Sequence, residues 1–171
     1  MIQGRLSLIA IVMLSSLALI QKSGAQTKVS EPTAGFSYTA PAGWQVRTFP
    51  GLKFKIAIAA PKNGFSLNIN VVDEKYAGSL KEYVKGALRT MAAMFAEYKL
   101  IGQSDFATSS GLKGVRLVSQ SRQQKILARA TVYIFPGKGT TKLIVTCSSL
   151  AEDGASHDAV FESVMKTFAV K

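Results

Sequence analysis

The chain has 171 residues, with 21 lysines and arginines against 10 aspartates and glutamates, one histidine and one cysteine, and a formal net charge of +11. A single cysteine excludes an internal disulfide, so the fold must depend on packing. The length fits one domain with a hydrophobic core, even after an N-terminal targeting segment is subtracted.

Residues 1–25 have the organisation of a secretory signal peptide. Arg5 precedes an apolar run over residues 6–20, and the small residues Ser23 and Ala25 occupy the positions expected before a cleavage site. The apolar run is shorter than the roughly 20 residues that span a membrane, which favours cleavage near Ala25 over an uncleaved anchor, the alternative. We therefore expect a periplasmic or secreted protein, with a net charge of about +9 once the cations Arg5 and Lys22 are removed.

After a polar leader, residues 26–34, strand patterns begin in a domain expected over residues 35–171. They occupy 36–39, 44–49, 52–60 and 65–72, with turns at 41–43, 50–51 and 61–64. Alternation predicts which side chains face inward in the third and fourth strands: Leu52, Phe54, Ile56, Ile58, Phe65, Leu67, Ile69 and Val71. It places the others toward solvent: Lys53, Lys55, Ala57, Ala59, Ser66, Asn68 and Asn70.

The apolar period then becomes helical over residues 79–99, where Ser79 and Glu82 have capping-box spacing. Four further strands are predicted at 100–107, 113–121, 126–135 and 141–148, and a second helix within 151–170. The short turns between these strands require antiparallel neighbours, since a parallel crossover needs a dozen or more residues. The sequence thus predicts a single α+β domain with a central antiparallel sheet flanked by helices.

Six segments, in this order and spacing, resemble the PsbP-like family. They are GFSYTAPAGW, the FPG at 49–51, FSLNINVV, SLKEYV, TKLIVTCSS and FESVMKTFAV, and together they span residues 35–170. The family takes its name from an extrinsic protein of the photosynthetic oxygen-evolving complex and includes bacterial periplasmic relatives of the DcrB type. The resemblance implies an α/β/α sandwich and a role in binding or assembly. It brings no catalytic residues, and the short leader fits a bacterial periplasmic member better than a photosystem subunit.

Trp44 and Cys147 are predicted to be structural. Pro41 fixes one backbone angle and Gly43 permits an unusual one, so the chain turns there and directs Trp44 into the domain. Ligand stacking is the alternative role for Trp44. Cys147 lies on an alternating apolar face, which favours a buried thiol over a nucleophile or an intermolecular disulfide.

The segment EDGASHD contains the best candidates for a metal or acid-base site, namely Glu152, Asp153, His157 and Asp158. Its spacing matches neither a calcium loop nor a zinc signature. A helix N-terminus explains it more simply, with Asp153 or Ser156 as the cap and Asp158 favourably placed in the macrodipole. The motifs of hydrolases and phosphate loops are missing from the sequence, so we predict neither an enzyme nor a cofactor.

Five cations form two short patterns, Lys53 and Lys55 in one predicted strand and Lys81, Lys85 and Arg89 along the first helix. Such patterns attract anionic partners, although they also serve simply to solvate a surface. Nucleic acid is not expected as the partner, because the lysines are not interleaved with exposed aromatic residues. The sequence favours an exported binding or assembly-support protein that docks on an acidic protein or an anionic envelope surface. A small-molecule carrier and a metal-dependent hydrolase using the His157 region are the alternatives.

Overall fold

The computed structural model of the protein describes residues 24–171. The predicted signal peptide falls on residues 1–25 and so lies almost entirely outside the described residues. In chain order the elements are β1 (Thr27–Glu31), β2 (Phe36–Ala40), β3 (Gln45–Arg47), β4 (Ile56–Ile58), β5 (Asn68–Lys75), α1 (Leu80–Met94), β6 (Ala96–Ala107), β7 (Lys113–Gln123), β8 (Ile126–Pro136), β9 (Thr141–Leu150), α2 (Asp158–Lys166) and β10 (Ala169–Val170). Of the helices within residues 24–171, neither is long and apolar enough to cross a membrane.

Seven strands form the main sheet, in the order β3-β4-β5-β9-β8-β7-β6. All its neighbours are antiparallel, and β6 to β9 form the predicted meander. The central strand β9 pairs with β8 on one side and with β5 on the other, so Val145 lies between Tyr133 and Val71. The chain reaches the edge strand β6 from β5 through α1, which carries it past three strand positions.

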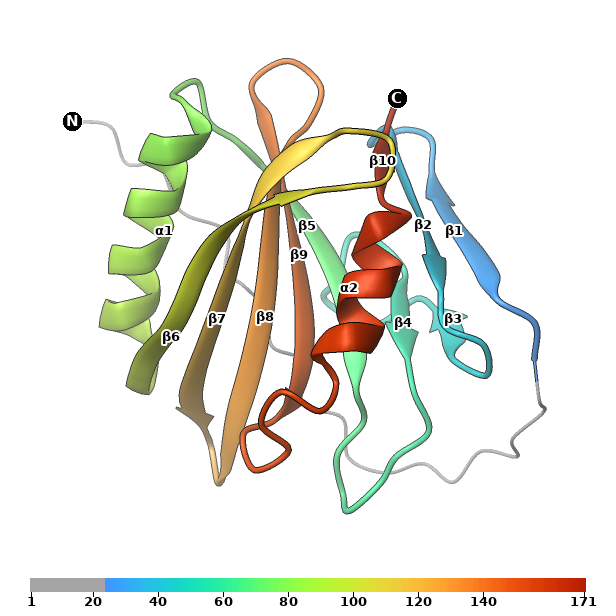
Figure 1. Ribbon diagram of the computed structural model, residues 1–171, viewed down its shortest axis with the longest axis vertical. Coiled ribbons are helices and arrows are strands. Elements are labelled where there is room, and N and C mark those ends of the chain that lie inside the picture. Colours follow the sequence, from blue (N-terminus) through green and yellow to red (C-terminus); the bar gives the residue numbers. More distant parts are fainter. Residues whose placement is uncertain (1–23) are drawn as a thin grey trace.

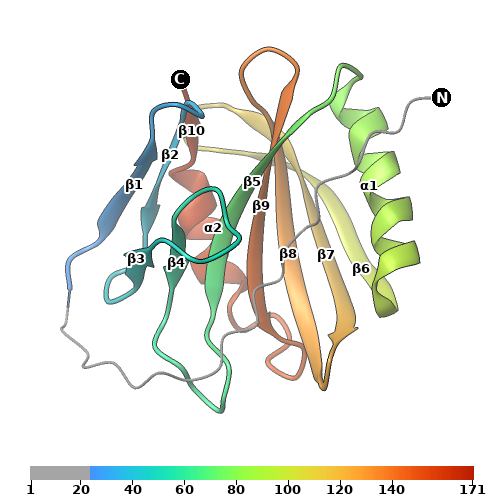
Figure 2. The same cartoon turned by 180° about the vertical axis from the view of Figure 1, so that it is seen from behind.

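The two helices lie on opposite faces of the main sheet (Figures 1 and 2). α1 packs over the β6–β8 end of one face, where Val84 and Ala87 join a cluster with Leu117 and Val132. α2 covers the other face together with a small sheet of order β1-β2-β10. The predicted α+β fold with a flanked antiparallel sheet is confirmed, and the small sheet is an addition to it.

The segment expected to be a polar leader, residues 26–34, contains β1. This strand pairs with all of β2, from Thr27 opposite Ala40 to Glu31 opposite Phe36. One side chain, Val29, is 2% exposed and belongs to the core, while its neighbours face solvent. A single apolar residue in a polar stretch does not produce the alternating pattern from which a strand is predicted. The strand forms because it pairs with β2.

Both helices are shorter than the sequence predicted. α1 ends at Met94 instead of Lys99, because Phe95 is extended and Glu97 has a positive φ of 52°, after which β6 follows. α2 covers only 158–166 of the predicted 151–170, since turns precede it and β10 pairs with β2 after it. Phe95 and Tyr98 still pack against the core beneath α1, although they do so from outside the helix.

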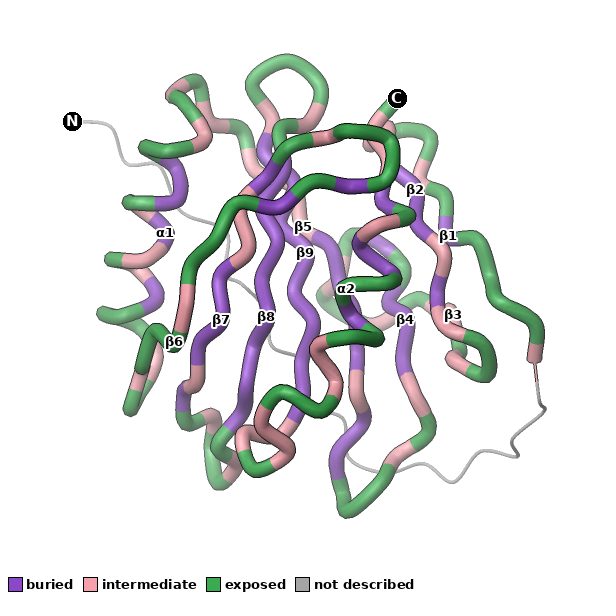
Figure 3. The backbone as a smooth tube through the Cα atoms, in the orientation of Figure 1, coloured by how far each residue is buried: buried purple, intermediate pink, exposed green. Residues whose placement is uncertain are grey.

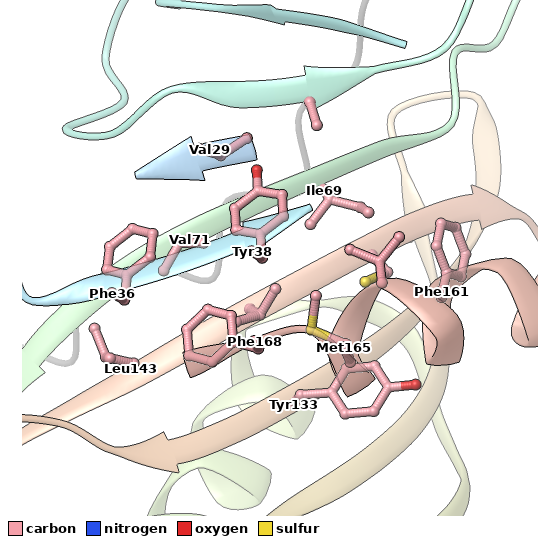
Figure 4. Close-up of a cluster of buried hydrophobic side chains, with 14 of the residues drawn as sticks. Val29, Phe36, Tyr38, Ile69, Val71, Tyr133, Leu143, Phe161, Met165 and Phe168 are labelled. Atoms are coloured by element: carbon pink, nitrogen blue, oxygen red, sulfur yellow. The ribbon is translucent and has the colours of Figure 1, made fainter. Parts of the chain in front are cut away.

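The larger hydrophobic cluster lies between the main sheet, the small sheet and α2 (Figure 4). Phe168 stacks on Phe135 at 4.9 Å and on Phe36 at 5.7 Å, which joins the end of α2 to both sheets. Fully burying aromatic side chains of this size is worth about 1.5–3 kcal/mol each, so the cluster supplies much of the driving force for folding.

The expectation that β4 and β5 are buried on one face only is wrong. Ala57, Asn68 and Asn70 are at most 1% exposed and Ser66 is 5% exposed, although all four were expected toward solvent. Ala57 and its cross-strand partner Ile69 face the larger cluster, and the adjacent pair of Ile58 and Asn68 is buried on the other face, so the sheet is buried on both faces there. Figure 3 shows the contrast with β6, whose edge position leaves it largely exposed.

Candidate functional site

The stripe of cations predicted on the first helix lies on α1. Ser79 caps the helix by accepting from the Glu82 N–H at 3.2 Å, and the Glu82 carboxylate accepts from the Ser79 N–H at 2.8 Å. The capping box satisfies N–H groups at the start of α1 and fixes where the helix begins, and the apolar face of the helix packs on the sheet. Lys81, Lys85 and Arg89 are exposed. Within residues 24–171, none of these three cations is in an ion pair. We name these three residues the α1 stripe.

The other two predicted cations occupy the connection between β3 and β4, at the opposite end of the main sheet from the α1 stripe (Figure 2). Lys53 is paired with Asp73 of β5, with Nζ to Oδ distances of 2.6 and 2.8 Å, and its Nζ lies 4.9 Å from the centre of the Phe54 ring. Lys55 is exposed, and its backbone N–H donates to Glu31 at 3.4 Å. The five cations therefore do not form one continuous patch.

A cavity of about 790 Å³ opens between the start of α1 and the β6–β7 hairpin. One wall is formed by Leu80, Lys81 and Val84 of α1, and the rest by residues 103, 105–107 and 113–115 of the hairpin. The cavity thus includes one member of the α1 stripe and a further exposed cation, Lys113. Its size is in the range of small-molecule sites, roughly 300–1,000 Å³.

An ionic cluster between β7, β8 and α2 was not predicted from the sequence. Asp158 accepts from Arg116 Nη2 at 2.8 Å and from Arg129 Nη2 at 2.9 and 3.2 Å. The Arg129 side chain is only 9% exposed, and those of Arg116 and Asp158 are 22% and 23% exposed. Tyr133 is fully buried beside Arg116, and this burial raises the pKa of its phenol well above the usual range.

The acidic segment 152–158 therefore does not come together as one site. Asp158 is held by the two arginines, whereas His157 Nε2 lies 3.2 Å from Asp153 Oδ2 and Glu152 is exposed in the preceding turn. In the described part of the chain, no three His, Cys, Asp or Glu side chains are grouped so that they could hold a metal ion. The expected cap, Asp153 or Ser156, is also wrong, because α2 begins after His157, whose side chain makes no capping hydrogen bond.

The turn before Trp44 has the features expected of it. Gly43 has a φ of 78°, and the Trp44 N–H donates to the Pro41 carbonyl at 3.2 Å. The indole is half-buried and meets the Phe161 ring of α2 edge-on at 6.5 Å. Trp44 thus packs against the core from its border, immediately before β3 begins.

Cys147 lies in the larger hydrophobic cluster with Leu143 and Val145 and has no exposed surface. Burial raises the pKa of its thiol far above the usual range. A buried, protonated thiol is a poor nucleophile, since the thiolate is the reactive form. This environment fits a structural residue.

Neither a family model nor a curated protein sequence matches the chain. Solved structures do match. Cyanobacterial PsbP from Synechocystis has a TM-score of 0.63 at 12% identity, covering 92% of this chain and 99% of its own. LpqN, involved in cell envelope biogenesis of Mycobacterium tuberculosis, has a TM-score of 0.63 at 12% identity, covering 86% and 91%. A Pseudomonas aeruginosa protein of unknown function has a TM-score of 0.59 at 18% identity, covering 86% and 99%.

These likenesses extend over nearly the whole described chain and confirm the PsbP-like fold that the sequence motifs indicated. The identities are too low to transfer a partner, a ligand or an activity. None of the three proteins is named as an enzyme.

Proposed function

We propose that the protein is an exported, non-catalytic binding or assembly-support protein that docks on an anionic partner through α1. One observation carries the proposal: the three cations of the α1 stripe are exposed, and none is in an ion pair with another described residue. Cations in this state can meet an external anion without first breaking an internal pair. Lys53 makes the contrast, because it is already matched to Asp73.

The geometry of α1 supports this use of the stripe. The helix buries Tyr83, Val84, Ala87 and Met91 on the sheet, so its position does not depend on the exposed cations. Rigidly placed charges of one sign speed the encounter with an oppositely charged partner and set its orientation. An acidic protein and an anionic envelope surface both fit this chemistry, and export would place the protein beside them.

The test compares two variants of equal charge change. In one, Lys85 and Arg89 become Glu; in the matched control, Lys125 and Lys138, two exposed lysines in turns of the sheet, become Glu. Binding is measured by co-sedimentation with phosphatidylglycerol vesicles and by calorimetry with polyglutamate, which represent the two kinds of partner. We expect the α1 variant to bind one of these probes at least about tenfold more weakly than the control does, a change of about 1.4 kcal/mol.

Salt provides the second arm of this test. At about 1 M salt the Debye length is roughly 3 Å, so binding through exposed charges should be largely lost. Equal weakening by the two variants, or binding that salt leaves unchanged, would contradict docking through α1. Phosphatidylcholine vesicles, which lack net charge, control for adsorption to lipid.

Two other functions remain as alternatives. The cavity between α1 and the β6–β7 hairpin favours a small-molecule carrier. A metal-dependent hydrolase using the His157 region stays a prediction, which metal analysis of the purified protein with a His157→Ala control would test. In the described chain, Asp158 would have to leave two arginines before it could bind a metal ion.

A further inference from the structure

The cavity beside α1 is built by residues that share one face of the β6–β7 hairpin. Asp105 lies opposite Val115 and Ala107 opposite Lys113 in the strand register, so these side chains project to the same side. Val115 packs against the cluster that includes α1, which identifies this side as the one facing the helix. The cavity is therefore a defined space between two secondary-structure elements.

Two cations of different elements line this space. Lys81 is the second residue of α1 and Lys113 is the first of β7, and both are exposed. No ion pair joins either lysine to Asp105 or to any other described residue. With the Asp105 carboxylate included, the charged residues of the lining sum to one net positive charge, which a monoanion would balance.

The remaining lining offers apolar surface. Leu80 and Val115 are half-buried, and Val84 lies deeper, at 3% exposure. A site with an apolar wall and a few polar groups at one end is typical of pockets for amphipathic small molecules. Simple anions would leave this wall unused, and purely apolar ligands would leave the two lysines without a partner.

We propose that this cavity binds a single-chain amphiphile with a monoanionic head group. The head lies between Lys81 and Lys113, and the chain packs against Leu80, Val84 and Val115. The site shares Lys81 with the α1 stripe, but Lys113 lies outside the stripe, so the Lys113→Gln test can fail independently of docking through α1. The head group could belong to a free fatty acid or to a single-chain phospholipid, and the test distinguishes the two.

The test titrates the purified chain, without residues 1–25, with three probes by calorimetry at pH 7: decanoate, decanoyl lysophosphatidylglycerol and decanol. We expect at least one anionic probe to bind saturably. Decanol should bind at least about tenfold more weakly than that probe. The Lys113→Gln variant should bind the anionic probe about tenfold more weakly, the change expected for the loss of one charge-assisted hydrogen bond. Hexanoate should bind at least about tenfold more weakly than decanoate if the free acid is the ligand, because four fewer methylene groups are buried.

Lys138→Gln is the matched control, since Lys138 is an exposed lysine in the turn between β8 and β9, lies outside the α1 stripe and does not line the cavity. It should leave amphiphile binding unchanged, and the melting temperature of each variant shows that the fold is retained. Decanoate binding assigns the site to a free acid, and binding of the lysophospholipid alone assigns it to a lipid. The proposal is overturned if neither anionic probe binds, if decanol binds equally well, or if Lys113→Gln in its folded form keeps full affinity.

Discussion

Replacing Asp158 with asparagine removes the carboxylate that lies between two arginine side chains under α2. The substitution hardly changes the side-chain volume, so its main effect is electrostatic. Arg116 and Arg129 would keep their places beneath the helix but lose the anion that both contact at 2.8–2.9 Å. We expect Asp158→Asn to be among the most destabilising polar substitutions in the domain.

The magnitude follows from burial. With 9%, 22% and 23% of the three side chains exposed, solvent can compensate only part of the lost interaction. Removing one partner of a buried ion pair typically costs about 3–5 kcal/mol, and the residual exposure favours the lower end, about 3 kcal/mol. For a domain of about 150 residues this corresponds to a fall in melting temperature of roughly 6–12 °C.

Urea unfolding followed by circular dichroism measures this free energy directly. Glu97→Gln is the matched control, because it breaks a pair with Arg122 in which both side chains are well exposed, 56% and 40%. Its cost should stay below about 1 kcal/mol. If Asp158→Asn were as mild as this control, the two arginines would not need their counterion and our description of the cluster would be refuted.

A triple variant separates the loss of attraction from the burial of unpaired charge. When Arg116 and Arg129 are also changed to methionine, Asp158→Asn no longer leaves a guanidinium without an anion. Replacing a complete buried ionic cluster with apolar side chains is often neutral or stabilising. We therefore expect the triple variant to be more stable than Asp158→Asn alone, and the opposite order would contradict an electrostatic origin.

Three further predictions concern the other described features. Trp44→Ala should cost about 2 kcal/mol in urea unfolding, below the roughly 3–5 kcal/mol typical of a fully buried aromatic residue, because the indole is half-buried against Phe161; an unchanged stability would restore a ligand-stacking role. Hydrogen bonds from the Ser79 backbone and side chain hold the pKa of Glu82 below its usual range. The stabilisation from Glu82 is therefore present above the unfolded-state pKa, near 4.3, and is lost as pH falls through the lower folded-state pKa. Glu82→Gln should flatten that part of the curve of stability against pH, and an unaltered curve would contradict this origin. Burial raises the pKa of Cys147, so a thiol reagent at about pH 8 should label it only in denaturant, and rapid labelling of the native protein would be inconsistent with the core described above.

The features that could be predicted from sequence are those fixed by neighbouring residues. The capping box of Ser79 and Glu82 locates the start of α1, because both partners lie within one helical turn. The meander of β6 to β9 follows from alternating strands separated by short turns, which leave only an antiparallel connection. The family resemblance depends on the same local segments in a fixed order.

Strands that have too little pattern of their own, and that are fixed by pairing with a neighbour, were missed. β1 has one core residue, Val29, and β10 has two residues in all, so neither carries a pattern of its own. Each is a strand because β2 lies beside it. The end of α1 is a related case, since apolar residues continue after Met94 at helical spacing while the chain already turns into β6. Periodicity shows which residues are apolar, but pairing in the sheet determines whether the backbone that carries them is helical or extended.

Site prediction was limited because the groups that meet in the fold lie far apart in the chain. Asp158 is 42 residues from Arg116 and 29 from Arg129 in the chain. Lys81 and Lys113 line the same cavity, although the whole of β6 separates them in the sequence. A search by spacing therefore grouped Asp158 with His157 and Asp153, its sequence neighbours, although the fold joins it to arginines. Close sequence spacing did not predict the cluster, because its side chains come from different strands and a helix that the fold brings together.

The net positive charge is also less informative than the pairing of individual cations. Arg116 and Arg129 share Asp158 inside the domain, Lys53 is matched by Asp73, and the α1 stripe has no acidic partner among residues 24–171. The same residue types thus stabilise the fold, neutralise a neighbouring strand and present charge to solvent. Changing charges anywhere on the surface alters the net charge equally, but only changes to the unpaired stripe should alter docking. Lys125 and Lys138 are likewise exposed and in no ion pair with a described residue, so the matched control keeps both net charge and pairing equal and tests only the position of the cations on α1.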